Sequence, residues 1–191
     1  MKKALIGYGG HSKEIINQIG TDLICFVDEP YFTEGTRLIS EFKSEEYEVI
    51  IAVADPETRK KIYEKLPSNT KFFTFIHPTA LIMNEDIEIG EGSFIGAYSI
   101  LTKNIKIGKH SLLNRGCQIG HDTVCGDFLS MMPGSIISGN CRIGNQVYIG
   151  TNSSIREKIT LCDNVVIGLN TGVVRDIKEE GTYISSKLIK I

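Results

Sequence analysis

From residue 77 onward, helical periodicity stops and a hydrophobic period of six residues begins. The clearest run, from residue 89 to residue 173, has no insertion, and its apolar positions are Ile89, Ile95, Leu101, Ile107, Leu113, Ile119, Cys125, Met131, Ile137, Ile143, Ile149, Ile155, Leu161, Ile167 and Val173. Glycine often follows the apolar residue directly, and a small serine or threonine often stands four positions after it. This pattern predicts a parallel β-helix in which three hexapeptides form one triangular coil and the apolar side chains point inward. Residues eighteen apart should then stack, in about five coils that rise roughly 24 Å.

Residues 1–76 have a different pattern, in which short apolar runs alternate with amphipathic stretches. We expect strands at 4–6, 23–28, 49–54 and 72–76, and helices at 11–20 and 57–66, the second one opened by Asp55 and Pro56. Strands that alternate with helices predict a small parallel α/β sheet of Rossmann type, which binds ligands beyond the carboxyl ends of its strands. The sequence therefore predicts a Rossmann-like domain at 1–76 and a β-helix domain at 77–191.

The composition excludes several classes of function. With 21 basic and 23 acidic residues, the net charge of −2 gives no reason to expect binding to nucleic acid or to an anionic membrane. The five cysteines lack the spacing of a zinc site, so we expect reduced thiols and no metal. Glycines interrupt the apolar N-terminal run before it reaches the length of a signal peptide or a membrane span, which predicts a cytoplasmic protein with small-molecule partners.

Several segments resemble the hexapeptide-repeat N-acetyltransferases that act on UDP-linked 4-amino-4,6-dideoxy sugars, and their relatives that act on GDP-perosamine and sialic acid. The matching segments are GYGGHSKEI at 7–15, CFVDE at 25–29, AVADPETRKKIYEKL at 52–66, IHPTALI at 76–82 and LNRGCQIGHDTVCGDF at 113–128. The resemblance implies a left-handed β-helix, acetyl-CoA as co-substrate, and a homotrimer with the acetyl-CoA groove between neighbouring β-helices.

Acyl transfer to an amine needs a base, and histidine suits this role at neutral pH. The chain has four histidines, His11, His77, His110 and His121. His121 should project outward from a corner of the β-helix, and the resemblance makes it the catalytic base, oriented by Asp122. Gly139 should stack above His121 and leave room for the pantetheine arm. We expect His110, in IGKHSL, to be a solvated corner histidine.

The loop from Gly7 to Ser12 is the candidate for nucleotide binding. Glycines between a strand and a helix let backbone N–H groups approach an anion, although a tight turn alone would also explain them. The loop lacks the full G-x-G-x-x-G pattern, which argues against a dinucleotide. The resemblance implies that Gly9, Gly10 and His11 contact the diphosphate and that Asp28 and Glu29 accept hydrogen bonds from the nucleobase; a simple strand-ending turn is the alternative for the acidic pair.

Two positions depart from the family pattern. Ser130 stands where relatives carry a second histidine that contacts the acyl-CoA, and SSKLI at 185–189 replaces the usual C-terminal segment. Ser130, Gly139, Thr151 and Leu169 are the predicted cofactor-binding positions.

The leading hypothesis is an acetyl-CoA-dependent N-acetyltransferase that acts on a nucleotide-linked amino sugar for surface glycan synthesis. A sugar O-acetyltransferase of the sialic-acid type would show the same base and fold. A β-helix that binds ligands without turnover is the third hypothesis, which the loss of the second histidine favours and the His121–Asp122 pair opposes.

Overall fold

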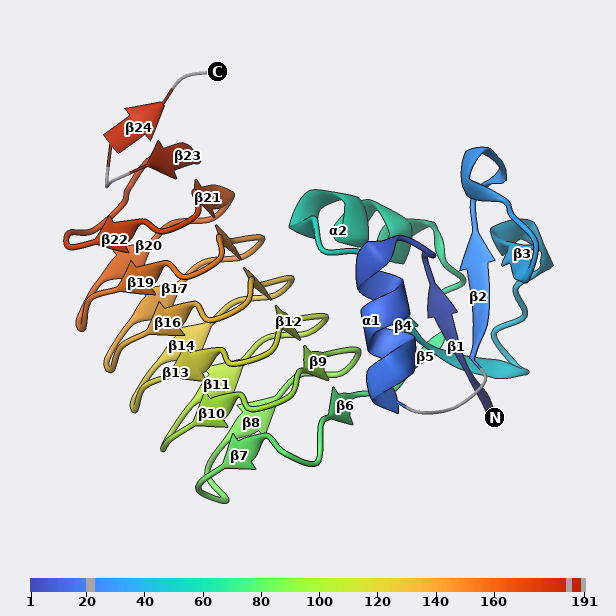
Figure 1. Ribbon diagram of the computed structural model, residues 1–191, viewed down its shortest axis with the longest axis horizontal. Coiled ribbons are helices and arrows are strands. Elements are labelled where there is room, and N and C mark those ends of the chain that lie inside the picture. The colour runs from blue at the N-terminus through green and yellow to red at the C-terminus, as the bar shows by residue number, and fades with distance from the viewer. Residues whose placement is uncertain (20–22, 185–186, 190–191) are drawn as a thin grey trace.

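The structure is a computed structural model that describes residues 1–19, 23–184 and 187–189 of the 191-residue chain. Figure 1 shows an α/β lobe, residues 2–72, beside a tall β-helix whose coils follow one another along the chain. Gly20, at the end of the first predicted helix, and Ser185 and Ser186 of the C-terminal segment lie outside the described residues.

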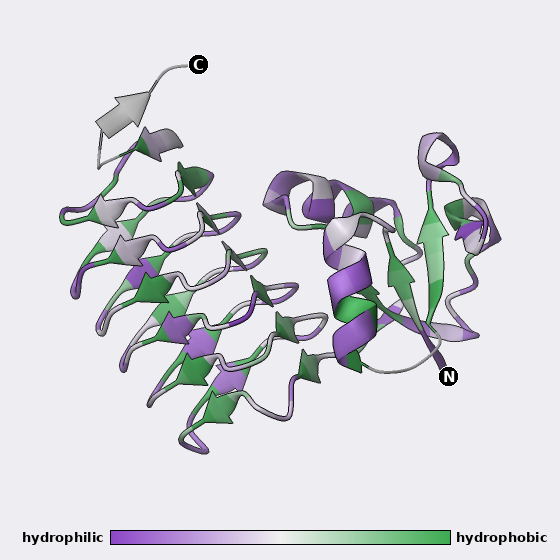
Figure 2. Cartoon of the chain, in the orientation of Figure 1, coloured by the Kyte–Doolittle hydropathy of each residue, from purple (hydrophilic) through white to green (hydrophobic). Residues whose placement is uncertain are grey.

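The N-terminal lobe is built on a five-stranded parallel sheet. Its strand order is β3 (Thr36–Leu38), β2 (Ile24–Val27), β1 (Lys2–Ile6), β4 (Tyr47–Ile51) and β5 (Lys71–Phe72). Figure 2 shows β2 and the second half of β1 as hydrophobic, which is typical of parallel strands that are covered on both faces. The Rossmann-like sheet is confirmed, and β3 is a strand that the hydrophobic pattern missed.

Two ten-residue helices cover the two faces of this sheet. Helix α1 (Gly10–Ile19) packs Ile15 against Leu5 and Ile50, whereas α2 (Pro56–Lys65) packs Ile62 against the opposite face. The side chain of Asp55 caps α2 by accepting a hydrogen bond from the Thr58 N–H at 2.8 Å, as its sequence position predicted. The short 3₁₀ turns η1 (Glu29–Tyr31) and η2 (Ile39–Glu41) follow β2 and β3. Within the described ranges, no helix is long and apolar enough to cross a membrane.

The predicted strand at 72–76 is wrong as a single element. Its first part is β5, in the sheet of the N-terminal lobe, and its last two residues form β6 (Phe75–Ile76), which pairs with β9 (Phe94–Ile95) in the β-helix. The chain leaves one sheet and enters the other within three residues, a change that an uninterrupted apolar run cannot reveal. That residues 1–76 and 77–191 behave as separate domains stays a prediction.

The β-helix has three sheets, one on each side of a triangular prism, and its left-handed form is confirmed. The lobe-facing sheet contains β6, β9, β12 (Leu112–Leu113), β15 (Ser130–Met131), β18 (Tyr148–Ile149), β21 (Val165–Ile167), β23 (Gly181–Ile184) and β24 (Lys187–Ile189). The second sheet contains β7 (Leu81–Ile82), β10 (Ile100–Leu101), β13 (Gln118–Ile119), β16 (Ile136–Ile137), β19 (Ser154–Ile155) and β22 (Gly172–Val173). The third sheet contains β8 (Glu88–Ile89), β11 (Lys106–Ile107), β14 (Val124–Cys125), β17 (Arg142–Ile143) and β20 (Thr160–Leu161).

The six-residue period sets the register of these sheets. Among the strands from β8 to β22, paired residues are eighteen apart, as in Gln118 and Ile136; β23, beyond them, pairs with β21 through residues sixteen apart. All the apolar positions from Ile95 to Val173 are buried inside the prism, and Ile89 packs against them at its lower end. The β-helix also starts earlier than the uninterrupted pattern, because β6 and β7 pair with residues nineteen positions ahead.

The cysteines of the prism point into its core. Cys117, Cys125 and Cys141 are buried and unbridged. Burial raises the pKa of the Cys125 thiol to about 12, so this group stays protonated and unreactive at neutral pH. The prediction of free thiols is therefore confirmed for these residues.

A buried arginine joins the two parts of the molecule. Arg59, on α2, is 1% exposed, and its guanidinium donates hydrogen bonds to the carbonyl oxygens of Val53, Ala54, His110, Phe128 and Leu129 and to the Ser130 hydroxyl, at 2.6–3.1 Å. Burial lowers its pKa to about 9, so it remains a cation at neutral pH. Arg59 therefore fixes the lobe to the β-helix through backbone groups of both.

Replacement of this guanidinium should destabilise the protein strongly. Arg59→Met keeps most of the side-chain volume but removes hydrogen bonds to five carbonyls, of which only those of Ala54 and Leu129 keep a second donor within the described structure, from Ser130 and Leu112. We expect the free energy of unfolding to fall by about 3 kcal/mol or more. Urea unfolding followed by circular dichroism measures this loss. The neighbouring half-buried Lys60 is the control, since Lys60→Met should cost less than about 0.5 kcal/mol. Equal unfolding midpoints for the two variants would contradict the role of Arg59.

Candidate functional site

A cavity of about 710 Å³ lies at the carboxyl ends of the lobe's central strands. Its walls come from the loop after β1, the end of β2, residues 52–54 after β4, the first half of α1, and one side of α2 from Thr58 to Lys65. Gly7 turns the chain at φ +110°, where a Cβ would lie 3.2 Å from Cγ2 of Val53. This backbone arrangement is suited to an anionic ligand, because the N-terminus of α1 opens into the cavity.

Four of the five predicted substrate-binding residues line this cavity. Gly9, Gly10 and His11 come from the loop and the first turn of α1, and Asp28 comes from the end of β2. Glu29 is exposed in η1 and is not among the lining residues. The structure therefore brings the loop and Asp28 together, because they follow the neighbouring strands β1 and β2. Glu29 does not line the cavity.

His11 is one of the residues that line the cavity, and one of its ring nitrogens has no hydrogen-bond partner among the described residues. Its Nε2 is buried and has no hydrogen-bond partner in the described structure, while its Nδ1 lies 3.6 Å from a carboxylate oxygen of Glu14. The ring packs edge-on against Phe94 of the β-helix. Burial lowers the pKa of His11, so the neutral ring is favoured. An unpartnered buried nitrogen beside a cavity is what a polar ligand would satisfy.

Three lysines around the same cavity were missed by the sequence analysis. Lys13 lines it from α1, and Lys61 and Lys65 line it from α2. The Lys13 ammonium lies 5.1 Å from the centre of the Tyr8 ring. The sequence did contain a signal for two of them. Lys61 and Lys65 are four residues apart in the helix that follows β4, so they lie on the same side of that helix. These cations suit a ligand that carries phosphates.

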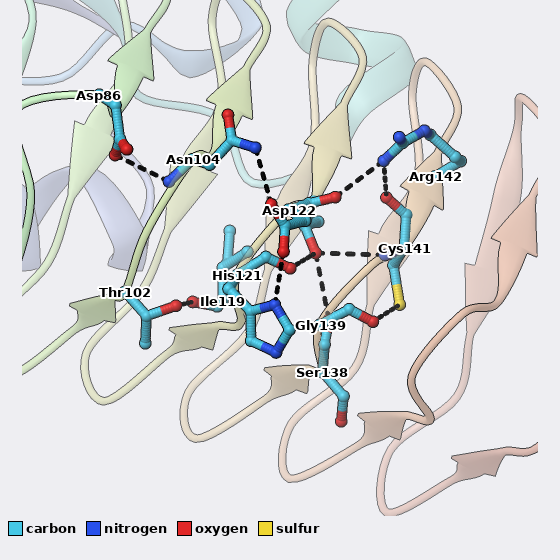
Figure 3. A network of polar contacts seen from close by, with 11 residues as sticks. Asp86, Thr102, Asn104, Ile119, His121, Asp122, Ser138, Gly139, Cys141 and Arg142 are labelled. Carbon is cyan, nitrogen blue, oxygen red and sulfur yellow. Dashed lines mark hydrogen bonds and ion pairs between the residues drawn. The ribbon is translucent and has the colours of Figure 1, made fainter.

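The candidate catalytic pair lies at the far corner, the edge of the prism where the second and third sheets meet. His121 and Asp122 form the turn between β13 and β14, and their side chains are 60% and 45% exposed. The imidazole Nδ1 lies 2.7 Å from Oδ2 of Asp122 (Figure 3). Hydrogen bonds from His121 and then from Asn104 lower the pKa of the Asp122 carboxyl. Because an ionised carboxylate only accepts hydrogen bonds, Nδ1 must donate, which leaves the lone pair of Nε2 available to take a proton.

Gly139 lies against the imidazole from the next coil. A Cβ on this glycine would stand 2.7 Å from Nε2 of His121. This distance is shorter than the contacts that Cβ atoms make in proteins, so a side chain at position 139 would force the imidazole to move. The absence of a side chain therefore keeps space beside the nitrogen that would act as the base, as the stacking argument predicted (Figure 3).

The other predicted cofactor residues lie away from His121 within the chain. Thr151 and Leu169 are exposed at the corner between the lobe-facing and second sheets, where the Asn170 N–H donates to the Thr151 carbonyl at 2.8 Å. Ser130 is fully buried under the lobe, and its hydroxyl donates to the Ala54 carbonyl at 2.6 Å and accepts from Arg59 at 2.9 Å. Ser130 therefore has a contact within the protein and no surface for a ligand in the single chain.

His110 is not the solvated corner histidine that we expected. It is 1% exposed, enclosed by the rings of Tyr63, Phe72 and Phe128, and neither ring nitrogen has a hydrogen-bond partner in the described structure. The lobe covers this corner, which the period of six cannot indicate. Burial lowers the pKa of His110 to about 4.

This buried histidine makes the stability of the protein depend on pH. The unfolded chain binds a proton at His110 below pH about 6.5, whereas the folded chain resists it down to about 4, so stability should fall as the pH drops between these values. Urea midpoints at pH 7.5, 6, 5 and 4.5 measure the effect. In His110→Phe, which retains an aromatic ring, this part of the pH dependence should disappear. An unchanged pH dependence in that variant would contradict the assignment.

Comparison with known proteins supports both parts of the fold. Residues 2–66 match the family model of the PglD N-terminal domain. Among curated proteins, the bifunctional protein GlmU of Alkaliphilus oremlandii is 28% identical over 156 residues, which cover 78% of this chain. The chain spans about a third of the length of the curated relatives that it matches.

Solved structures match nearly the whole chain. A histidine-to-asparagine mutant of perosamine N-acetyltransferase from Caulobacter crescentus, in complex with CoA and GDP-perosamine, has a TM-score of 0.85 at 21% identity and covers 96% of this chain and 93% of that one. WeeI from Acinetobacter baumannii has a TM-score of 0.86 at 24% identity, with 96% of both chains covered. The acetyltransferase domain of PglB from Neisseria gonorrhoeae has a TM-score of 0.68 at 26% identity, with 95% of both chains covered. Residues 2–66 are therefore similar to the PglD N-terminal domain, and the chain as a whole has the fold of these hexapeptide-repeat transferases.

Proposed function

We propose that the protein is an acetyl-CoA-dependent N-acetyltransferase whose acceptor is the amino group of a nucleotide-linked amino sugar used for surface glycans. The observation that carries the proposal is the His121–Asp122 pair, in which a carboxylate holds Nδ1 and leaves Nε2 beside the open space at Gly139. The solved relatives in complex with CoA and GDP-perosamine, or with acetyl-CoA, support the same substrates. The cytoplasmic location belongs to this proposal as a prediction.

The geometry of the pair supports a direct mechanism. The sugar amine attacks the carbonyl carbon of the thioester, and Nε2 of His121 takes the proton that the nitrogen loses as the new C–N bond forms. The C–S bond then breaks, and CoA leaves with its electron pair and is protonated. Asp122 stabilises the imidazolium that results, because its carboxylate faces Nδ1 at 2.7 Å. No metal takes part in this scheme.

The cavity of the N-terminal lobe would hold the nucleotide. Backbone N–H groups of the Gly9 and Gly10 loop, Nε2 of His11 and the lysines at the rim offer donors and positive charge to a diphosphate. The Asp28 carboxylate can accept hydrogen bonds from a nucleobase.

The relation between the cavity and His121 favours a homotrimer. The lobe packs on the lobe-facing sheet, through contacts such as those of Ile15 and Phe73 with Phe94 and Leu112, while His121 lies at the opposite edge of the prism. A substrate held in the cavity of one copy would therefore meet His121 of another. A closed ring of three copies provides three such pairings, and it would bring Thr151 and Leu169 of one copy towards the far corner of the next.

A substrate panel tests the proposed function. UDP- and GDP-linked 4-amino-4,6-dideoxy sugars, the corresponding 4-hydroxy sugars and sialic acid are each incubated with acetyl-CoA, while thiol release and product mass are followed. We expect thiol release and an N-acetylated product with an amino sugar and none with its hydroxy counterpart. Release with sialic acid alone would identify an O-acetyltransferase, and no release with any acceptor would favour the non-catalytic alternative.

Asp28→Ala should weaken nucleotide binding specifically. The variant loses the carboxylate that accepts hydrogen bonds from the nucleobase, so the KM for the nucleotide sugar should rise about tenfold or more. The kcat should stay nearly unchanged, because this contact is the same in the ground state and the transition state. Steady-state kinetics with acetyl-CoA saturating measures both constants. Glu41→Ala, an exposed acid outside the cavity wall, is the control. A fall in kcat at constant KM would show that Asp28 does not act in nucleotide binding.

A further inference from the structure

A chain of hydrogen bonds extends from His121 across the coils of the far corner (Figure 3). Oδ2 of Asp122 binds Nδ1 of His121, and Oδ1 of the same carboxylate accepts from Nδ2 of Asn104, both at 2.7 Å. The Asn104 N–H in turn donates to Oδ1 of Asp86 at 2.8 Å. Three coils therefore contribute to the environment of one imidazole.

The backbone explains why Asn104 reaches this carboxylate. Asn104 and Asp122 occupy the same corner position in successive coils, and both have left-handed backbone conformations, with φ of 50° and 60°. Asparagine and aspartate tolerate this conformation better than other residues with a side chain. Because the two positions are eighteen residues apart, their side chains stack and the amide faces the carboxylate.

The bond to Asn104 changes what the carboxylate can do. The side chain of Asp122 is 45% exposed, so a single bond to the imidazole would leave the carboxylate free to rotate and exchange its partner for water. With Oδ1 held by an amide, Oδ2 is directed at Nδ1. We propose, on the basis of the proposed role of His121 as base, that Asn104 is a positioning residue that fixes Asp122 and thereby keeps the proton of the neutral imidazole on Nδ1.

Similar bonds occur at another corner and provide a matched control. Asn164 also has a left-handed conformation, with φ of 57°, and its Nδ2 donates to a carboxylate oxygen of Glu180 at 3.2 Å. No histidine contact is recorded for that carboxylate in the described part of the chain. A purely structural role predicts the same consequences for the loss of either asparagine.

The test compares Asn104→Gly with Asn164→Gly. Glycine accepts the left-handed backbone without strain, so each variant removes the amide without straining the chain. The control also loses the bond that Gln146 donates to Asn164 at 2.6 Å, which lies far from His121 in the sequence of coils. Nitrogen-15 NMR of the neutral His121 ring reports the fraction with the proton on Nδ1. We expect this fraction to fall in Asn104→Gly and to match the wild type in Asn164→Gly. On a confirmed substrate, kcat should fall roughly threefold to tenfold in Asn104→Gly at unchanged KM, and change less than about twofold in the control.

Identical ring spectra and identical kcat for the two variants would overturn the proposal. Since the spectra require no substrate, they test Asn104 even if wild-type protein acetylates nothing in the panel, which would refute the proposed function instead. If Asn104→Gly does not fold, Asn104→Asp keeps the shape and the backbone preference but turns an acceptor towards the Asp122 carboxylate. It should also lower the Nδ1–H fraction, and a wild-type spectrum would again overturn the proposal.

Discussion

The His121→Ala variant should bind both substrates normally and turn over about 10²–10⁴-fold more slowly. The imidazole side chain is 60% exposed at a corner and contributes no packing to the core, so assembly and stability should be retained. What the variant loses is the group that removes the proton during attack on the thioester. Steady-state measurements of kcat and of both KM values separate this chemical effect from binding.

Two comparisons show whether the loss is due to the base. Asp122→Asn should cost about tenfold, because it removes the negative charge that stabilises the imidazolium and leaves the imidazole in place. A general base must be unprotonated to act, so kcat should rise with pH in the wild type, and this rise should be absent in His121→Ala. The Asp122 carboxyl cannot produce it, since hydrogen bonds from His121 and Asn104 lower its pKa and keep it ionised across the neutral range. Near-normal turnover of His121→Ala would mean that the protein only positions an amine that is already neutral.

Gly139→Ala should lower kcat about tenfold to a hundredfold although it adds only a methyl group. The new Cβ would stand 2.7 Å from Nε2 and 2.9 Å from Cε1 of His121, so the imidazole must move. Movement of the ring either breaks its bond to Asp122 or covers the nitrogen that takes the proton. Affinity for the nucleotide sugar, measured by calorimetry, should be unchanged because the lobe is not involved.

Gly172→Ala is the control for this prediction. Gly172 lies in a strand of the second sheet, and apart from its two chain neighbours a Cβ added there would meet no atom of the described residues within 4 Å, so kcat should stay within about twofold of the wild type. Wild-type kinetics for Gly139→Ala would contradict the assignment of Nε2 as the working atom.

The β-helix could be predicted from the sequence because its rule is local. One apolar residue in six, followed by small residues, determines which side chains point inward, and positions such as Ile119 and Ile137 are buried and paired as expected. The same period placed His121 at a corner with Gly139 above it. The N-terminal strands and helices were found for a similar reason, since their hydrophobic periodicities are local.

The contacts between the two parts could not be predicted in this way. An arginine on an amphipathic helix is expected at the surface, and only the docking of α2 on the prism turns Arg59 into a buried donor and Ser130 into its partner. Docking also encloses His110, which stands at a corner of the prism as the exposed His121 does. The split of residues 72–76 between two sheets has the same origin, because pairing with distant strands decides it.

The central claim, that the base of one copy serves the cavity of another, can be tested by co-expressing two inactive chains with different affinity tags. One chain carries His121→Ala and the other carries Asp28→Ala together with Lys65→Ala, and oligomers that bear both tags are isolated. A cyclic trimer of mixed composition contains one site in about three that combines an intact cavity with an intact histidine from the neighbouring copy. We therefore predict acetyl transfer, at a nucleotide-sugar concentration below KM, of about a third of the wild-type rate and well above that of either parent. A mixed oligomer no more active than its parents would contradict the account.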